Sequence, residues 1–434
     1  MNDTKKIGFW TCTALVVGNT IGMGIFLLPA SLAPFGLNAL IGWVVVVLGC
    51  LALARVFAHL ARELPQAEGP YGYVRSTLGE LPAYVALWCY WVSLWITNAA
   101  LATGVVGYLQ AVFPELVVLH PSLCALVLLW VFVAINSAGV RSGGAVQIVT
   151  TGLKLLPMLA VAALGAWVLF TTPGEYVAHP PTPAITLGAT MSAATIALFA
   201  MLGIESATVP ASKVREPGIT IPRATLVGTL VVAVIYLIVS TVPLLLIPEA
   251  QLAESSAPFA LLMSLFGGDG SGRWLALFVV VSGLGALNGW TLLVGELTRT
   301  MAGHGVLPGF LASSNRAGAP GRALLVTGVL GSVMVLMSYS KTLVAGFTFL
   351  TTVVTAANLP LYACCSLALV VTWRRGGGTR TGMLVASLLA LAFVVFAFIG
   401  MGREPFLWAL VLAVAGLPLY AFLRLRPKKA VGHA

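Results

Sequence analysis

Charged residues are scarce in this sequence. Only 8% of its 434 residues are Asp, Glu, Lys or Arg, whereas 59% are hydrophobic. A soluble globular protein carries about 25% charged residues, so this chain has too few to cover a water-facing surface of its own size. The shortage excludes a soluble enzyme, a disordered protein and a nucleic-acid-binding protein.

Patterns that bind metals or carry catalysis are also missing. The five histidines form no metal-binding spacing, and there is no Ser/His/Asp set and no glycine-rich phosphate loop. We therefore expect no enzyme, no metal and no cofactor. All six cysteines fall inside apolar runs, where they act as small core residues, so no structural disulfide is expected; they are Cys12, Cys50, Cys89, Cys124, Cys364 and Cys365.

Long hydrophobic runs are abundant, and a helix crosses a membrane in about 20 residues. Reading these runs between polar, proline or glycine breaks predicts about twelve transmembrane helices. Lys5 and Lys6 precede the first run, and no small-residue cleavage site follows, which favours a retained first helix over a signal peptide. The predicted helices cover residues 9–33, 37–61, 82–111, 121–139, 146–170, 187–212, 222–247, 273–302, 321–339, 345–372, 381–400 and 405–424.

Basic residues are distributed unequally between alternate loops. Nineteen of the 23 lie on the side that holds both termini, and three, Arg273, Lys341 and Arg403, lie on the other side. Lys154 alone falls deep inside a predicted helix. Because cytoplasmic loops carry the excess of Lys and Arg, this bias places both termini in the cytoplasm. The net charge of +10 is therefore a signal of topology.

Two predicted helices contain segments unsuited to an uninterrupted helix. Residues 18–24 hold three glycines in the middle of the first helix, and residues 199–206 place a glycine, an acid and a serine at membrane depth in the sixth. Close helix packing alone would explain single glycines. Their matching positions in two halves of five helices instead point to a transporter binding site. The free ends of the half-helices would suit the carboxylate and the ammonium of an amino acid.

Short motifs along nearly the whole chain resemble those of the amino acid–polyamine–organocation superfamily. The chain is most similar to its bacterial basic amino acid/polyamine antiporters, such as the arginine/agmatine and lysine/cadaverine exchangers. The motifs are Lys5-Lys6-Ile7-Gly8, Gly18-Asn19-Thr20-Ile21-Gly22-Met23-Gly24-Ile25, Leu27-Leu28-Pro29-Ala30, Gly69-Pro70-Tyr71-Gly72-Tyr73, Gly203-Ile204-Glu205-Ser206-Ala207, Glu216-Pro217 and Gly289-Trp290-Thr291-Leu292-Leu293.

The resemblance implies an all-α membrane protein with a LeuT-like fold and alternating access. Residues 1–434 would form a single polytopic domain with a 5+5 inverted repeat and broken helices 1 and 6. Residues 1–170 would hold the first repeat, residues 187–372 the second, and residues 381–424 two extra helices.

The resemblance also implies where the substrate binds. The backbone around Gly22, Met23 and Gly24, next to Asn19, would hold its carboxylate, and carbonyl groups near Phe199 and Leu202 would hold its α-amine. Trp290 would cover the substrate side chain, which Asn98 would approach at its far end. Tyr90, Glu205 and Tyr362 match the positions that close the cytoplasmic gate.

Three positions depart from the pattern of this group. Met23 and Val354 stand where serine occurs in relatives, and Phe199 stands where the arginine/agmatine type has tryptophan. These changes make the pocket more apolar, whereas a guanidinium needs hydrogen-bond partners as well as an aromatic face. They argue against arginine as the substrate.

Three ionisable residues lie inside predicted helices, where charge is costly and usually functional. Glu205 is either a proton-sensitive gate or a carboxylate favoured by a helix start. Lys154 matches a lysine of other superfamily members that stands where Na⁺-coupled relatives hold sodium; a structural lysine bonded to carbonyls is the alternative. Glu296 lies about 120° around its helix from Trp290, so it lines the cytoplasmic vestibule or pairs with a basic residue.

The leading hypothesis is a secondary active antiporter that exchanges a cationic amino acid for its decarboxylated amine or another amino acid. The alternative is an exchanger or proton-coupled importer of neutral amino acids, which Met23, Phe199, Val354 and Lys154 favour. The expected location is the bacterial inner membrane. The expected partners are amino acid or amine substrates and the lipid bilayer, without nucleic acid, and the resemblance leaves a homodimer open.

Overall fold

The computed structural model describes residues 8–67, 69–139, 144–205, 214–268, 270–376, 378 and 380–425. The predicted N-terminal Lys5 and Lys6, the loop residues Arg141 and Lys213, and residues 206–212 of the sixth predicted helix lie outside these ranges. Helices without any strand make up the regular structure of the described part, which confirms the all-α prediction.

The longer helices match the predicted hydrophobic runs. They are α1 (Phe9–Thr20), α2 (Gly24–Leu32), α3 (Leu37–Glu63), α5 (Glu80–Val112), α6 (Pro121–Ser137), α7 (Gly144–Thr171), α9 (Leu187–Leu198), α10 (Pro217–Leu246), α13 (Ser271–Gly303), α14 (Gly321–Met337), α15 (Leu343–Arg375), α16 (Thr381–Gly400), α17 (Arg403–Val414) and α18 (Gly416–Leu425).

Eight helices in the described ranges are long and apolar enough to cross a membrane, and the pair α1 and α2 makes a ninth broken span. Three of the remaining predicted segments form shorter apolar helices, namely α6, α14 and the stretch Leu187–Met201. The count of twelve spans, the 5+5 repeat and its boundaries stay predictions.

Connecting segments depart most from the predicted pattern. Short helices that were not predicted fill the links between the long ones: α4 (Gly69–Leu78), α8 (Glu175–Ala178), α11 (Glu249–Glu254) and α12 (Pro258–Gly267). The last predicted helix is divided at Ala415 into α17 and α18. α10 begins five residues before its predicted start, because Pro217 occupies the first helical turn, where a missing N–H costs nothing.

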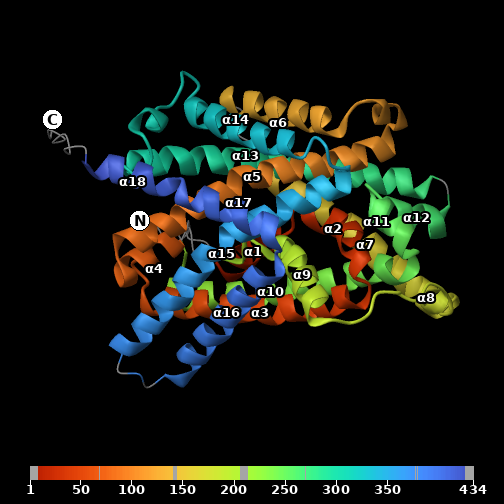
Figure 1. The fold of residues 1–434 in the computed structure, drawn as a ribbon, viewed down its shortest axis with the longest axis horizontal. Coiled ribbons are helices and arrows are strands. Elements are labelled where there is room, and N and C mark those ends of the chain that lie inside the picture. Colours follow the sequence, from red (N-terminus) through yellow and green to blue (C-terminus); the bar gives the residue numbers. More distant parts are fainter. Residues whose placement is uncertain are drawn as a thin grey trace.

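The helices pack in two groups on either side of α15 (Figure 1). In one group α3 contacts α9 and α10, and α10 contacts α1. In the other group α5 contacts α6, α13 and α14. In the view of Figure 1 the pair α6 and α14 lies along the upper edge, opposite α3 and α16.

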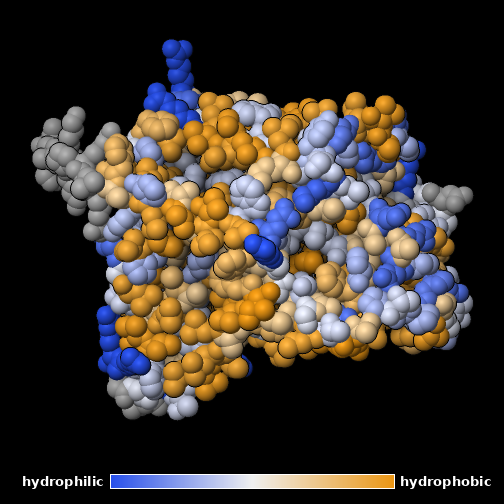
Figure 2. All heavy atoms as spheres, viewed as in Figure 1, coloured by the Kyte–Doolittle hydropathy of each residue, from blue (hydrophilic) through white to orange (hydrophobic). Residues whose placement is uncertain are grey.

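The surface of the described part is more apolar than that of water-soluble proteins. Figure 2 shows broad hydrophobic areas on the visible face, with hydrophilic side chains at the left and right ends of the view and in a band near its middle. Leu48 of α3 and Ile399 of α16, for example, are 63% and 66% exposed. Contiguous apolar surface of this extent needs lipid to cover it, so the chain is a multi-pass membrane protein.

Candidate functional site

The first predicted helix is broken at the glycine-rich segment. α1 ends at Thr20, α2 begins at Gly24, and the two meet at a bend of 46°. Ile21 has an extended backbone and its N–H still bonds to the carbonyl of Val17 at 2.9 Å. The prediction of a broken first helix is therefore confirmed. Because a helix end leaves its last carbonyls without helical partners, each of them needs another donor.

Long-range partners supply those donors. The Lys154 ammonium of α7 donates to the Gly18 carbonyl at 3.2 Å, and the Tyr236 hydroxyl of α10 donates to the Thr20 carbonyl at 3.0 Å. The same hydroxyl accepts the backbone N–H of Gly22. Tyr236 thus bridges the two sides of the break. Sequence reasoning missed Tyr236, although a tyrosine in the middle of an apolar run needs a hydrogen-bond partner.

The sixth predicted helix is broken as well. α9 ends at Leu198 and a 3₁₀ turn covers Phe199–Met201, after which Leu202 is extended and Gly203 has a φ of +101°. A Cβ added at Gly203 would lie 3.3 Å from the Asn19 carbonyl oxygen. The two breaks therefore touch through their backbones, which only a glycine with this φ permits.

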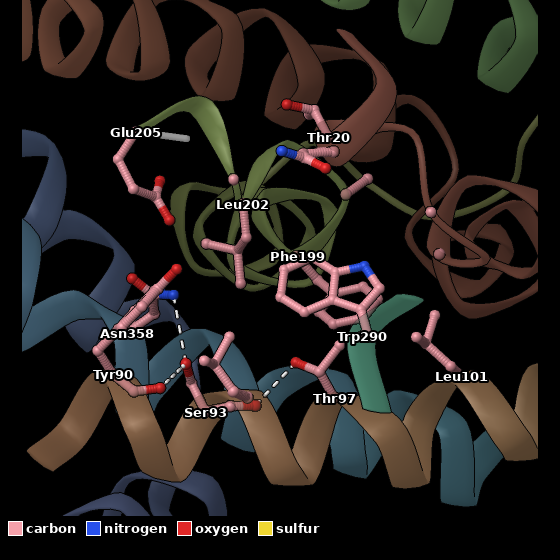
Figure 3. Close-up of a pocket in the computed structure, with 16 residues that line it drawn as sticks. Thr20, Tyr90, Ser93, Thr97, Leu101, Phe199, Leu202, Glu205, Trp290 and Asn358 are labelled. Atoms are coloured by element: carbon pink, nitrogen blue, oxygen red, sulfur yellow. Dashed lines mark hydrogen bonds between the residues drawn. The ribbon is translucent and has the colours of Figure 1, made fainter. Parts of the chain in front are cut away.

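A small cavity lies where the breaks meet (Figure 3). Its volume is about 30 Å³, which is room for about one water molecule. The predicted residues that line it are Asn19, Gly22, Gly24, Tyr90, Phe199, Leu202, Glu205 and Trp290. In this conformation the cavity cannot hold an amino acid, so binding requires the surrounding helices to move apart.

An aromatic ring fills one end of the cavity. A Cβ added at Gly24 would lie only 2.7 Å from the Phe199 ring, so the glycine lets this ring lie directly on the start of α2. Phe199 also makes an edge-to-face contact with Phe347, with ring centroids 6.1 Å apart. Phe199 and Trp290 both line the cavity, and Figure 3 shows them at the end away from Glu205. This aromatic end of the cavity is apolar.

The opposite end of the cavity is polar. Glu205 is 2% exposed, and its carboxylate accepts the Tyr362 hydroxyl at 3.0 Å. It also accepts the Tyr90 hydroxyl and the backbone N–H groups of Gly203 and of Glu205 itself. The three residues predicted for the gate thus come together, from α5, the helix 6 break and α15. The buried carboxylate oxygens are thus satisfied by hydrogen-bond donors.

Three predicted substrate-binding residues lie outside the cavity lining. Met23 is fully buried, and a Cβ added at Gly283 of α13 would lie 2.8 Å from its sulfur. Asn98 of α5 and Val354 of α15 are 4% and 1% exposed and do not line the cavity either. Their contact with substrate stays a prediction for a more open conformation.

Other polar residues line the cavity without having been predicted. Asn358 of α15 donates to the Ser93 hydroxyl at 3.4 Å, and this hydroxyl donates to the Tyr90 carbonyl at 2.7 Å (Figure 3). Thr97 lies one turn further along α5 and also lines the cavity. Ser93 and Thr97 follow Tyr90 by three and seven residues, a spacing that places all three on one face of a helix and that could have been found in the sequence.

The other two intramembrane charges occupy different surroundings. Lys154 is 4% exposed and ties α7 to the end of α1. Glu296 instead forms an ion pair with Arg299 one turn along α13, at 2.6 Å, with its side chain 34% exposed. The prediction that Glu296 pairs with a basic residue is confirmed. The six cysteines are all free thiols, as expected.

Comparisons with known proteins agree with this architecture. A family model described as amino acid permease matches residues 7–416. A Bacillus subtilis (strain 168) protein with the provisional name arginine/ornithine antiporter is 33% identical over 98% of both chains. The putrescine transporter PotE of Escherichia coli (strain K12) is 28% identical over 97% of this chain and 96% of its own. The cadaverine/lysine antiporter of the same organism is 32% identical over 78% of this chain and 76% of its own.

The family match covers nearly the whole chain, and two of these relatives exceed 30% identity. The predicted resemblance to basic amino acid/polyamine antiporters is thereby confirmed, and the LeuT-like fold fits the two broken helices. The chain belongs to the amino acid permease family.

Proposed function

We propose that this chain is a secondary active antiporter that exchanges a cationic amino acid for its decarboxylated amine or another amino acid. The observation that carries the proposal is the meeting of two broken helices at a cavity with an aromatic end and a carboxylate end. The relatives named for arginine/ornithine, putrescine and cadaverine/lysine support this substrate class.

The site offers a separate partner for each part of such a substrate. Backbone N–H groups at the start of α2, around Gly24, would hold the carboxylate at a helix N-terminus, next to the Gly22 N–H that Tyr236 accepts. Carbonyls at the end of α9, near Phe199 and Leu202, would hold the α-ammonium. Trp290 would lie against the side chain, where an aromatic face attracts a cation.

Transport would proceed by moving one helix group against the other. α3 contacts α9 and α10, α10 contacts α1, and these four helices carry both breaks, whereas α5, α6, α13 and α14 form the second group. The cavity lies between them, lined by Phe199 from one group and by Trp290 from the other. Rocking the first group would open the site to one side of the membrane at a time.

Lys154 would act as a built-in cation. Its ammonium already occupies the carbonyl end of α1, where a free cation would otherwise be needed to satisfy the break. Exchange should therefore not depend on Na⁺. The location that we propose is the bacterial inner membrane with both termini cytoplasmic, as the basic residues in the loops indicate; a homodimer stays a prediction.

Counterflow in proteoliposomes tests the proposed function. Liposomes loaded with a cationic amino acid should accumulate labelled lysine or ornithine, and the corresponding diamines, in exchange for it. If only leucine- or alanine-like substrates exchange, the neutral alternative replaces the proposal. The relatives do not favour that alternative. The apolar Met23, Phe199 and Val354 do favour it, so counterflow of neutral amino acids belongs in the same experiment.

Replacing Trp290 by alanine should raise KM for a cationic substrate roughly tenfold, because a cation over an aromatic ring gains about 0.5–2 kcal/mol. Kinetics of counterflow measure the change. Trp274→Ala is the matched control: Trp274 lies at the start of the same helix, 66% exposed and away from the cavity. An unchanged KM in Trp290→Ala would remove this residue from the binding site.

Replacing Lys154 by methionine should slow exchange at least tenfold, because a hydrogen bond from a charged donor contributes about 1.5–3 kcal/mol. The methionine side chain is about as long as the aliphatic part of lysine, but it leaves the Gly18 carbonyl without its ammonium donor. Leu156→Met on the lipid-facing side of α7 serves as control. Wild-type rates in Lys154→Met would show that the lysine is structural only.

A further inference from the structure

A second, larger chamber lies beyond the central cavity. Its volume is about 560 Å³, and it is lined by residues of α2, α9, α15 and the segment that joins α16 to α17. Three of these helices continue from the chamber into the central cavity. Ile196 of α9 lines the chamber, and Phe199 in the turn that follows α9 lines the cavity; along α2 the corresponding residues are Ser31 and Gly24.

The chamber and the central cavity follow one another along α15. Along α15, Thr348 and Thr352 line the chamber, Asn358 lines the cavity, and Tyr362 reaches Glu205 beyond it. The chamber and the Glu205 end thus lie on opposite sides of the central cavity. With both termini cytoplasmic, as proposed above, the chamber faces the outside. The Phe199 ring lies on Gly24 at the cavity end of α2.

One cation already occupies this chamber. The Lys341 ammonium lies 3.7 Å from a Glu404 carboxylate oxygen and 5.0 Å from the centroid of the Phe349 ring. All three residues line the chamber. A carboxylate and an aromatic face around one ammonium are a recognition site for a primary amine.

The ion pair between Lys341 and Glu404 is weak enough for a ligand to displace the lysine. The side chains of Lys341 and Glu404 are 32% and 61% exposed, and exposed ion pairs contribute little because water and salt screen them. Phe349 is only 7% exposed, so its ring is a fixed part of the wall. Next to it the hydroxyls of Thr348 and Ser31 are joined at 2.7 Å, which adds a polar contact for a ligand.

We propose that this chamber is a transit site for the terminal ammonium of the cationic substrate, which Glu404 and Phe349 bind after it displaces Lys341. Lys341 is then a tethered competitor that holds the site while it is empty. The proposal rests on the proposed exchange of cationic substrates. An extended diamine would place one ammonium here before the other reaches Phe199.

Single substitutions of Lys341 and Glu404 test whether the lysine competes with substrate or only forms a structural ion pair. Lys341→Gln should lower the external KM for a diamine about two- to fivefold, because the competing cation is gone, whereas Glu404→Gln should raise it by a similar factor. Phe349→Leu should also raise the external KM. The KM for substrate on the inside should not change in any of them. Sided counterflow with putrescine as the probe measures both constants.

Arg273→Gln is the matched control, since it removes one exposed basic charge from the same predicted side without touching the chamber. It should leave KM unchanged. If Lys341→Gln and Glu404→Gln shift the external KM in the same direction, or not at all, the transit site is overturned while the exchange function stands. If the wild type exchanges only neutral amino acids, the proposed function fails and the transit site with it.

Discussion

Replacing Glu205 by glutamine is expected to lower the exchange rate at least tenfold, the largest effect of any single side chain in the site. The carboxylate accepts hydrogen bonds from two tyrosine hydroxyls and two backbone N–H groups. In glutamine one of the two carboxylate oxygens is replaced by an NH₂ group. This group is itself a donor, so it cannot accept the hydrogen bonds that the replaced oxygen accepted. Because hydrogen bonds to a charged group contribute about 1.5–3 kcal/mol each, and about 1.4 kcal/mol is a factor of ten, losing one is enough.

The measurement is counterflow of a cationic amino acid, repeated across a range of pH. If Glu205 senses protons, the variant should lose the pH dependence of the wild type as well as its rate. Glu254→Gln, an exposed carboxylate on α11, is the control and should behave like the wild type. Tyr362→Phe should give an intermediate loss. An identical pH profile in Glu205→Gln would assign the carboxylate a structural role.

The two helix breaks could be located from the sequence because they depend on local residues. Three glycines within residues 18–24 lower helix propensity, and Gly203 adopts a conformation that other residues rarely do. The division of α17 from α18 at Ala415 also has a local signal that the predicted single helix over 405–424 did not use. Gly416 and Pro418 follow Ala415, and Pro418 has no N–H to donate to the Val414 carbonyl four residues earlier. Packing adds to this, since a Cβ added at Gly416 would lie 2.7 Å from the Trp88 ring of α5.

The candidate site was predicted less completely than the breaks. The trio of Tyr90, Glu205 and Tyr362 followed from the family resemblance, because their separation in the sequence hides their contact. Tyr236 was missed because its bond to Thr20 joins helices that are more than 200 residues apart. Such pairs are set by tertiary packing, which periodicity within one helix does not report.

The position of Asn98 shows how a small rotation decides the lining of a site. Tyr90, Ser93, Leu94, Thr97 and Leu101 of α5 all line the cavity. On an ideal helix, Asn98 points roughly 80° away from Tyr90, at the margin of that face. Its side-chain oxygen is buried without a hydrogen-bond partner. A modest rotation of α5 as the site opens would turn this oxygen toward the substrate, which would restore the predicted contact.

Replacing Gly203 by alanine should reduce exchange more than tenfold and destabilise the protein. The backbone at φ +101° costs a residue with a Cβ about 1–3 kcal/mol. The new methyl group would also lie 3.3 Å from the Asn19 carbonyl oxygen, which is tight for a carbon–oxygen contact. The first helix break would have to move away from the second.

Gly188→Ala is the matched control for Gly203→Ala. Gly188 lies in α9 at the other end of the same broken helix, does not have a positive φ, and would have nothing within 4 Å of an added Cβ. Alanine there should leave exchange unchanged and raise thermal stability slightly, because it favours the helix. Counterflow and thermal unfolding of the purified protein measure the two effects.

The comparison separates two roles for the glycine. If Gly203→Ala unfolds at the wild-type temperature and exchanges at the wild-type rate, the contact between the breaks is incidental. If stability falls but exchange is kept in the folded fraction, the glycine serves packing alone. Loss of exchange in protein that remains folded would mean that the site needs both half-helices in backbone contact, because only then do the ends of α1 and α9 face one substrate.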